Sequence, residues 1–381
     1  MIGLAAFWRW RRVASGALHI GLLVMFPLVP MQFAQAAWAV SRADMRCTGP
    51  GALASPAGNR PSRRVLLITY DELEYASVFE NRPPDLQLPA FDSLRSQSLL
   101  ATAMTSPATR TERAVPSVLT GRAVRQAHLT GRDELELTFA DGESGRFSPD
   151  ATVFARARSM EVDSGLAGFF LPYCSMIGSV LTTCSWEPCV TCGRRVGAFG
   201  STLLGSMRNQ VSELAPRYGP RRHLRAYRAI QTGALELAAD PALGLVFLHL
   251  PVPHDPFIYD RRAGDYSLRT RHEYFDNLAL ADRSLGEILD ALTSSGLASR
   301  TSVLVFGDHG RRSTDDGMTV RDPRVVFLVR LAGQSQGTVY PHALDTTVVH
   351  DLALAILDGS VSSPDELGPW LERWGAARPP D

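Results

Sequence analysis

The feature that most constrains this chain is a short apolar run that ends in chemically active side chains. Residues Ser302–Phe306 are mostly β-branched and apolar, which is typical of a strand buried on both faces. Asp308 and His309 follow directly, and Gly310 permits a sharp turn. Functional residues of open α/β sheets lie just beyond the carboxyl ends of strands, and a carboxylate beside an imidazole suits Zn²⁺ or Mn²⁺. A turn whose Asp only caps the next helix explains the same residues, so the rest of the chain must decide.

Two further apolar runs end in the same way. Residues Arg64–Tyr70 predict a buried strand that stops at Asp71, and Leu243–Leu250 predict another that leads to His254, held between prolines. Taken alone, Asp71 is better explained as a helix cap or a surface acid. The carboxyl ends of parallel strands meet at one sheet edge, so we expect Asp71 and His254 to lie near Asp308.

A candidate for a reactive hydroxyl, Thr111, lies at the start of a predicted helix. The segment 105–122 is turn-like in its first half and becomes helical from Thr111, with Glu112 in the first turn. A hydroxyl in this position is usually an N-cap. The same position also favours an anion and an alkoxide, because the backbone N–H groups and the helix dipole lie there.

Strands that alternate with helices predict an α/β fold with a mostly parallel central sheet flanked by helices. A further strand is predicted at Val325–Leu331 and a hairpin without chemistry at 133–147. Asp282, in the middle of a predicted helix, is expected to be a hydrogen-bonding core acid rather than a ligand. The remaining helices are predicted at 213–240, 271–294 and 346–357.

Composition narrows the chemistry. The 381 residues include 39 basic and 39 acidic side chains, so no bulk field indicates nucleic acid. The chain has no lysine, which excludes Schiff bases and P-loops and leaves arginine as the fixed cation for an anionic substrate.

The amino end predicts export. Arg9, Arg11 and Arg12 precede an uncharged stretch from 13 to 41, which is long enough to span a bilayer. We interpret residues 1–41 as a cytoplasmic stub with a single signal anchor in the inner membrane, and the catalytic part as periplasmic. A removed signal peptide, cleaved after Ala34-Gln35-Ala36, is the competing interpretation. Residues 42–62 then form a linker, 63–365 the catalytic domain and 366–381 a frayed tail.

The cysteines agree with export. Four of the five cysteines cluster, and in an oxidising compartment they favour two disulfides, with a zinc knuckle as the alternative. The spacing does not decide the pairing. The clustered cysteines are Cys174, Cys184, Cys189 and Cys192, and Cys47 stands apart.

The order of these elements resembles the alkaline phosphatase/sulfatase superfamily from about residue 64 to about residue 360. After the strand that ends in an acid, the motifs are T-x-x-A-V-P-S-x-L-T-G-R, H-L-x-x-P-H-x-P, Y-F-D-N-L-x-L-x-D-x-x-L-G and V-F-G-D-H-G. The resemblance is greatest to the membrane-anchored branch that includes phosphoethanolamine and phosphoglycerol transferases. It implies an alkaline-phosphatase-like three-layer sandwich.

The resemblance also implies roles for individual residues. The implied ligands of one divalent metal ion, Zn²⁺ or Mn²⁺, are Asp71, Thr111, Asp308 and His309. Thr111 is also the implied nucleophile, selected over Thr109 by its distance from the P-S-x-L-T-G-R residues, and His254 contacts the transferred group or the leaving oxygen. Arg113 and Arg122 are candidates for binding the substrate anion in the absence of lysine.

Four departures from the family pattern shape the prediction. Formylglycine-dependent sulfatases need Cys or Ser at the nucleophile position, and the lysines with which they hold sulfate are missing, so we favour phosphate esters. Asp71 stands where the transferases usually have Glu. No convincing second metal set appears, although His249 and His342 stay open as ligands.

The sequence thus predicts a metal-dependent enzyme that hydrolyses or transfers phosphate esters of the cell envelope, with a lipid or glycan substrate and a membrane as partners. Two alternatives stay open. One is a sulfuric ester hydrolase of the same superfamily, and the other is a catalytically inactive envelope protein that keeps the fold for binding.

Overall fold

The structure describes most of the predicted catalytic domain. This computed structural model describes residues 26, 62–130, 134–188, 219–268, 273–312 and 322–378. The predicted anchor and nearly all of the linker lie outside these ranges, apart from residues 26 and 62, as do Cys47, Cys189 and Cys192. Within the described ranges, no helix combines the length and the apolar character needed to cross a bilayer. The division into anchor, linker and domain stays a prediction.

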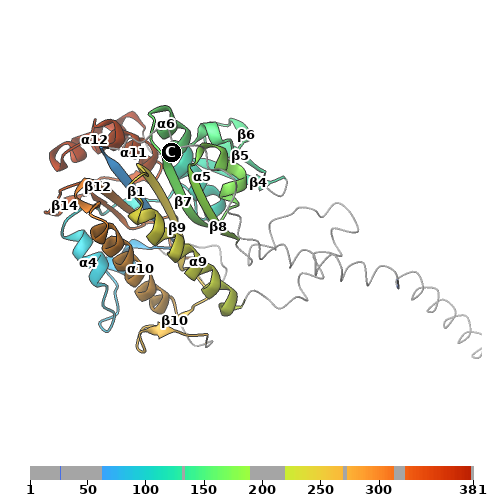
Figure 1. The fold of residues 1–381 in the computed structure, drawn as a ribbon, viewed down its shortest axis with the longest axis vertical. Helices are drawn as coiled ribbons and strands as arrows, with labels where there is room; N and C mark the ends of the chain where they lie inside the picture. The colour runs from blue at the N-terminus through green and yellow to red at the C-terminus, as the bar shows by residue number, and fades with distance from the viewer. Residues whose placement is uncertain are drawn as a thin grey trace, which may run out of the picture. The chain divides into compact units, whose positions relative to one another are not determined.

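A central eight-stranded sheet organises the fold (Figure 1). Strand β13 runs antiparallel to both of its neighbours, and the other neighbouring pairs are parallel. The mostly parallel sheet is therefore confirmed. In spatial order its strands are β14 (Thr338–Tyr340), β2 (Leu99–Ala101), β13 (Phe327–Arg330), β12 (Thr301–Gly307), β1 (Arg64–Asp71), β9 (Leu245–Pro253), β7 (Ser164–Phe170) and β8 (Thr183–Pro188).

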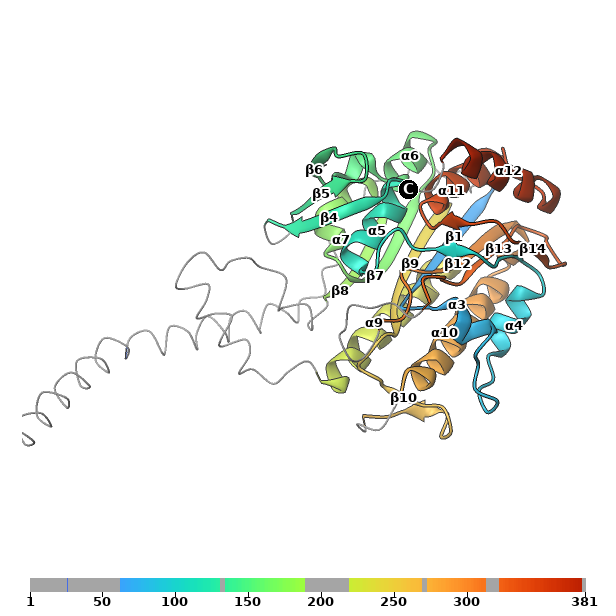
Figure 2. The same cartoon turned by 180° about the vertical axis from the view of Figure 1, so that it is seen from behind.

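Helices cover both faces of this sheet, which gives three layers (Figures 1 and 2). The first face packs against α5 (Thr111–Thr120), α6 (Val153–Ser159), α7 (Tyr173–Ile177), α11 (Val348–Asp358) and α12 (Pro364–Ala377). The second face packs against α3 (Tyr75–Phe79), α4 (Pro89–Arg95), α9 (Pro220–Ala239) and α10 (Tyr274–Ser294).

Short elements complete the domain. A three-stranded sheet contains β4 (Val124–Leu129), β5 (Leu135–Phe139) and β6 (Ser144–Arg146), which confirms the predicted hairpin. Two-stranded pairs are β10 (Tyr259–Asp260) with β11 (Asp265–Tyr266), and β3 (Met104–Thr105) with β15 (Leu344–Asp345). Single 3₁₀ turns lie at Pro149–Ala151, Gly178–Val180 and Ala298–Arg300.

Alternation along β1 explains how one strand serves two cores. Val65 and Leu67 belong to the core on the first face, whereas Leu66 and Ile68 belong to the core on the second. All four side chains are at most 1% exposed. Burying each stabilises the fold by about 1.5–3 kcal/mol, which is why the run is apolar without alternating with polar residues.

Two element boundaries differ from the sequence prediction. Strand β9 continues to Pro253, three residues beyond the predicted end, and so carries the chain up to His254. The prediction of a frayed tail from residue 366 is wrong for most of its length, because α12 occupies Pro364–Ala377. A capping box between Ser363 and Glu366 starts this helix, and the buried Leu367 and Leu371 anchor it in the core.

One disulfide is present among the described residues. Cys174 at the start of α7 bonds to Cys184 on β8. This pairing excludes a zinc knuckle made of the four clustered cysteines, because two of the thiolates are consumed. It agrees with the oxidising compartment that the sequence predicts.

Candidate metal and nucleophile site

The parallel pairing of β1 with β12 brings two aspartates to one edge of the sheet. Tyr70 on β1 pairs with Gly307 on β12. The residues that follow them, Asp71 and Asp308, therefore lie side by side. The backbone N–H of Asp308 donates to the carbonyl of Tyr70 at 3.2 Å, which continues the ladder up to the site. Asp71 and Asp308 are 237 positions apart in the sequence, and the shared sheet edge brings them together as predicted.

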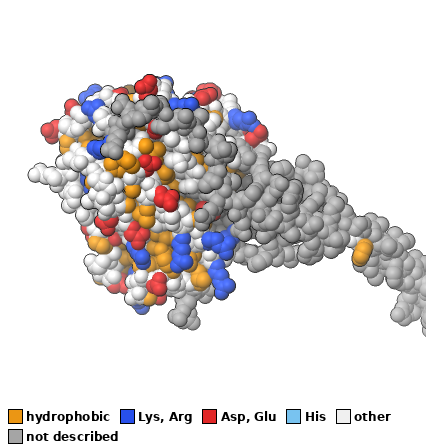
Figure 3. All heavy atoms as spheres, viewed as in Figure 1, with side chains coloured by type: hydrophobic (Ala, Val, Ile, Leu, Met, Phe, Trp, Pro, Cys, Tyr) orange, Lys and Arg blue, Asp and Glu red, His pale blue; other side chains and the backbone are white. Residues whose placement is uncertain are grey.

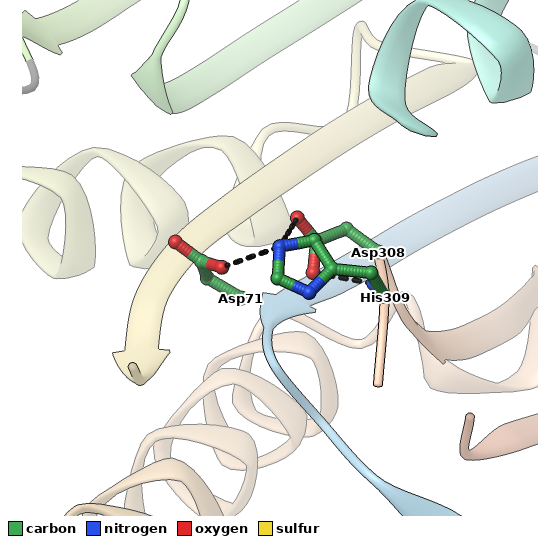
Figure 4. A group of neighbouring side chains, drawn as sticks. All are labelled: Asp71, Asp308 and His309. Atoms are coloured by element: carbon green, nitrogen blue, oxygen red, sulfur yellow. Dashed lines mark hydrogen bonds and ion pairs between the residues drawn. The ribbon is translucent and has the colours of Figure 1, made fainter. Parts of the chain in front are cut away.

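His309 Nε2 is the centre of this cluster, shown in Figure 4. It lies 3.5 Å from Asp71 Oδ1 and 3.6 Å from Asp308 Oδ2. The hydroxyl of Thr111 lies 3.3 Å from the same nitrogen. Asp71, Asp308 and His309 each offer one ligand atom within 4.8 Å of the others, and all three are at most 2% exposed.

The hydrogen bonds around the cluster leave its inward atoms ready for a cation. Asp308 Oδ1 accepts from the backbone N–H groups of Glu72 at 3.0 Å and His309 at 2.7 Å. His309 Nδ1 donates to the carbonyl of Gly310 at 3.0 Å, which leaves the Nε2 lone pair free of a proton. Asp71 Oδ1 and Asp308 Oδ2 are buried and have no hydrogen-bond partner within the described residues.

These residues fit a divalent metal ion. Buried carboxylate oxygens without a partner are costly unless something positive compensates them. Burial, with a smaller contribution from the neighbouring Asp308 carboxylate, raises the pKa of Asp71 to about 7 against the opposing effects of His254 and His309. Two carboxylates, an imidazole and a hydroxyl form a mixed oxygen and nitrogen donor set that suits Zn²⁺ or Mn²⁺. Asp71, Asp308, His309 and Thr111 would hold the ion.

Thr111 is positioned by α5. It is the first residue of the helix and is 4% exposed, and Arg110 precedes it in extended conformation. The positive end of the helix dipole stabilises negative charge at this hydroxyl. Thr109 is exposed, and its hydroxyl accepts from the guanidinium of Arg113 at 3.3 Å. Of the two candidate threonines, Thr111 is the one that contacts His309.

Three ionisable side chains, Arg312, Glu72 and His254, form a second cluster beside the first. Arg312 Nε donates to Glu72 Oε1 at 2.8 Å, and Arg312 Nη2 lies 2.6 Å from His254 Nε2. His254 Nε2 is also 3.7 Å from Glu72 Oε1, and the backbone N–H of His254 donates to the carbonyl of Asp71 at 3.2 Å. His254 is thus brought to the site, as predicted.

Opposing influences act on His254. Burial lowers its pKa, but the carboxylates of Asp71 and Glu72 outweigh this and raise the pKa to about 9. The 2.6 Å contact from Arg312 requires instead that Nε2 accept a hydrogen bond, so it fits the neutral ring. Nε2 can hold a proton only when the Arg312 N–H turns to another acceptor.

The backbone at Glu72 is strained. Its φ of 66° is left-handed, which is uncommon for a residue with a side chain. The Tyr274 hydroxyl donates to its carbonyl at 2.7 Å, and Asp308 accepts from its N–H, so the turn is held from both sides. This turn keeps the Glu72 side chain, 7% exposed, within reach of Arg312.

The two predicted substrate arginines lie in other contacts. Arg113 donates to the carbonyl of Arg125 at 3.1 Å and to Thr109. Arg122 bonds Asp141 and Glu143, both at 2.6 Å, and lies 3.9 Å above the ring of Phe139. Neither set of contacts includes a residue of the metal cluster, so substrate binding by Arg113 and Arg122 stays a prediction.

The remaining candidates are also placed. Asp282 accepts from the backbone N–H groups of Ala90 and Phe91 at the start of α4, which agrees with its prediction as a core acid. His342 is exposed and contacts the ring of Tyr340, whereas His249 is fully buried on β9.

Sequence reasoning missed Glu72 and Arg312. Glu72 follows Asp71 directly, and the acid pair resembles an ordinary surface turn. Arg312 lies three residues after His309, and the absence of lysine was the signal that could have found it, since some arginine must then serve any anion at this edge.

Residues 235–347 match the family model described as Sulfatase. No curated protein sequence matches the chain significantly.

Solved structures match over most of the domain. Ps i-CgsB is 14% identical, covers 81% of this chain and 74% of its own, and superposes with a TM-score of 0.56. The PsFucS1 sulfatase from Pseudoalteromonas sp. is 15% identical, the match covers 79% of this chain and 68% of that one, and the TM-score is 0.56. The phosphonate monoester hydrolase SpPMH from Silicibacter pomeroyi is 14% identical, the match covers 78% of this chain and 73% of that one, and the TM-score is 0.50. The alkaline-phosphatase-like fold is therefore confirmed. The comparisons support the superfamily resemblance in its general form and do not select a branch.

Proposed function

We propose that this protein is a metal-dependent enzyme of the alkaline phosphatase/sulfatase type that hydrolyses or transfers phosphate esters, with Thr111 as the nucleophile. The observation that carries the proposal is the convergence of the Thr111 hydroxyl and two unpartnered carboxylate oxygens on His309 Nε2. A site that only stabilised the fold would leave these acceptors hydrogen-bonded.

Each residue has a proposed role. A bound divalent ion supplies a Lewis acid that offsets negative charge at the reacting oxygens and eases loss of the hydroxyl proton. Thr111 Oγ1 gives its proton to bulk water and forms a bond to phosphorus while the bond from phosphorus to the leaving oxygen breaks, and His254 donates the proton that the leaving oxygen takes. Water, or the hydroxyl of a lipid or glycan, then attacks phosphorus and gives its proton to the now neutral His254. The bond from phosphorus to Thr111 Oγ1 breaks in this second step, and that oxygen takes a proton from water.

Arg312 is the proposed anion-binding residue, in place of Arg113 and Arg122. Its guanidinium already lies between Glu72 and His254 at the site. A substrate anion that accepts from Arg312 would draw its N–H away from His254 Nε2. The nitrogen could then hold the proton that the leaving oxygen needs, so substrate binding and acid catalysis would be coupled.

Sulfate ester hydrolysis is the second candidate. The family model over residues 235–347 favours it, because its description is Sulfatase. Phosphate remains the first choice because the chain has no lysine and has threonine at position 111 where formylglycine would need Cys or Ser.

We also propose that the domain works outside the cytoplasm as a single-pass inner-membrane protein. The disulfide between Cys174 and Cys184 supports an oxidising compartment. Arginines before the uncharged stretch 13–41 support an anchor with its amino end in the cytoplasm.

The full-length protein, purified in detergent, tests the function beside its Thr111→Ala variant. Both are assayed on chromogenic phosphate mono- and diesters and on a sulfate monoester, with Zn²⁺ or Mn²⁺ and then with a chelator. We expect phosphate cleavage that the chelator abolishes and the variant lacks. Cleavage of sulfate alone would select the second candidate, and inactivity on every substrate with no bound metal would favour a binding protein.

A further inference from the structure

The helix α9 begins on the rim of the candidate site. A short loop joins α9 to β9, so the helix runs back along the strand and its first turn lies at the strand's carboxyl end. The ring of His223, in this first turn, lies 6.0 Å from the ring of Phe169 near the end of β7. Since β7 and β9 are parallel, both strands end at the sheet edge that carries the site.

The first half of α9 carries a concentrated positive charge. Residues 220–235 contain four arginines and no acidic residue, whereas the whole chain balances 39 basic against 39 acidic side chains. Spacings of three and four residues place these arginines along one side of the helix. Figure 3 shows basic side chains gathered over this part of the domain. The four residues, which we call the α9 arginines, are Arg221, Arg222, Arg225 and Arg228.

The fold itself does not account for this charge. Acids are preferred in the first turn of a helix, next to the positive end of its dipole, and α9 has arginines there and no acid. Within the described residues, Arg221 and Arg222 make no ion pair. Arg283, by contrast, is paired with Glu287 at 2.9 Å. Positive charge that costs helix stability and lacks an acid on the described protein surface is complementary to an anion outside it.

The hairpin of β10 and β11 extends this surface with an aromatic and an apolar side chain. The guanidinium of Arg228 lies 4.5 Å from the centre of the Tyr266 ring on β11. Leu268 and Val339 are the large apolar side chains that are exposed in the described part of the domain, and Leu268 lies two residues beyond Tyr266. Arginine beside an aromatic ring and an exposed leucine is typical of protein surfaces that contact lipid headgroups.

We infer that the α9 arginines and the hairpin dock the catalytic domain onto an anionic phospholipid surface, with the rim of the site towards the bilayer. Guanidinium groups bind lipid phosphates through paired, charge-assisted hydrogen bonds. The predicted linker 42–62 would hold the domain near the bilayer, since a flexible chain of this length spans about 25 Å. A tethered surface needs only a weak contact to stay docked. Docking rests on the proposed membrane location and is independent of the proposed chemistry.

Vesicle binding tests the docking surface without an activity assay. The full-length protein is held in nanodiscs of phosphatidylcholine and mixed with sucrose-loaded vesicles, which are then sedimented. The vesicles are either phosphatidylcholine alone or equal parts of phosphatidylcholine and phosphatidylglycerol. We expect binding to the mixed vesicles only. Combined Arg221→Gln, Arg222→Gln and Arg228→Gln should weaken it by about 100-fold, since each arginine near an anionic surface contributes about fivefold.

A matched control removes the same charge from the other face of the sheet. Arg156 and Arg158 on α6 and Arg373 on α12 are all exposed, and both helices pack against the first face. Their combined replacement by Gln should weaken vesicle binding less than about threefold, because charges further from the lipid than the screening length contribute little. Thermal melting of both triple variants verifies that they fold.

The outcomes separate docking from the function beneath it. Equal losses in the two triple variants would overturn the docking surface, because net charge alone would then explain binding. Equal binding to both kinds of vesicle, or to neither, would also overturn it. Release by inorganic phosphate, where chloride of equal ionic strength has no effect, would assign the α9 arginines to a soluble anion instead. Vesicle binding that depends on these arginines, in a protein that cleaves no ester, would overturn the proposed chemistry and leave docking standing.

Discussion

Thr111 Oγ1 lies 3.3 Å from His309 Nε2, although 198 residues separate them in the chain. The contact joins the amino end of α5 to the carboxyl end of β12. His309 Nδ1 donates to a backbone carbonyl, so Nε2 accepts and the Thr111 hydroxyl is its donor in this state. The hydroxyl proton of the proposed nucleophile thus already points towards the cation site.

Substitution of Thr111 gives the first prediction. Thr111→Ala should lower kcat by about 10³-fold or more, because it removes the attacking oxygen. Thr111→Ser should retain measurable activity, since it keeps a hydroxyl at the amino end of α5. Steady-state kinetics on a chromogenic phosphate ester measures both.

Thr109→Ala is the matched control for the nucleophile. Thr109 is exposed and contacts Arg113, so its loss should change kcat less than about twofold. Activity that survives Thr111→Ala and is lost in Thr109→Ala would contradict the assignment.

Asp71→Asn gives a prediction on stability whose sign depends on metal. The pKa of Asp71 is raised to about 7, so the folded metal-free protein holds a proton that the unfolded chain releases near pH 4. The free energy of unfolding of the metal-free protein should therefore fall as pH rises from 4 to 7, by up to about 4 kcal/mol. Asp71→Asn carries no charge at this site and should remove this dependence.

At pH 7 the same substitution should raise the melting temperature of the metal-free protein and lower metal affinity. Chemical denaturation from pH 4 to 7, with a chelator present, measures the first effect, and isothermal titration measures the second. Lower stability of metal-free Asp71→Asn at pH 7 would show that the wild-type carboxylate is already compensated within the protein.

The site residues that lie at the carboxyl ends of strands could be predicted from the sequence. Asp71 and Asp308 each follow a buried apolar run, and in a parallel sheet the carboxyl ends of neighbouring strands share one edge. Thr111 required the family motif, because a hydroxyl at a helix start is usually a cap. The sheet and its flanking helices followed from the same alternation of strands and helices.

What escaped prediction depends on backbone geometry and on side-chain contacts across the fold. Glu72 reaches the site because its φ is 66°, a conformation that local sequence does not specify for Glu. Arg312 is defined by Glu72 and His254, partners 240 and 58 residues away. The carboxyl end was misplaced for a different reason: the capping box of α12 is a local signal that the prediction overlooked, and burial of Leu367 and Leu371 then anchors the helix.

Arg312 gives a prediction that separates it from the arginines first considered. Arg312→Met should raise KM by about tenfold or more, because it removes the charged donors at the site. Arg113→Met should leave KM nearly unchanged, since Arg113 bonds Thr109 and the carbonyl of Arg125. Kinetics of the two variants on one phosphate ester decides between them, and a larger effect of Arg113→Met would restore the original assignment.

His254→Gln tests proton donation through the leaving group. A general acid matters most when the departing oxygen is basic, so the variant should lose about 10²- to 10⁴-fold in kcat/KM on an alkyl phosphate ester. On a nitrophenyl ester, whose leaving oxygen needs no proton, the loss should be at least tenfold smaller. Both esters are compared in the wild type and the variant at one pH, with metal saturating.

The choice of Gln isolates the proton-donating function of His254. Its side-chain oxygen still accepts a hydrogen bond from Arg312, but it cannot deliver a proton, so the variant removes the acid and leaves the charge of Arg312 in place. An equal loss on both esters would assign His254 to substrate binding instead, because a binding contact does not depend on the basicity of the oxygen that leaves.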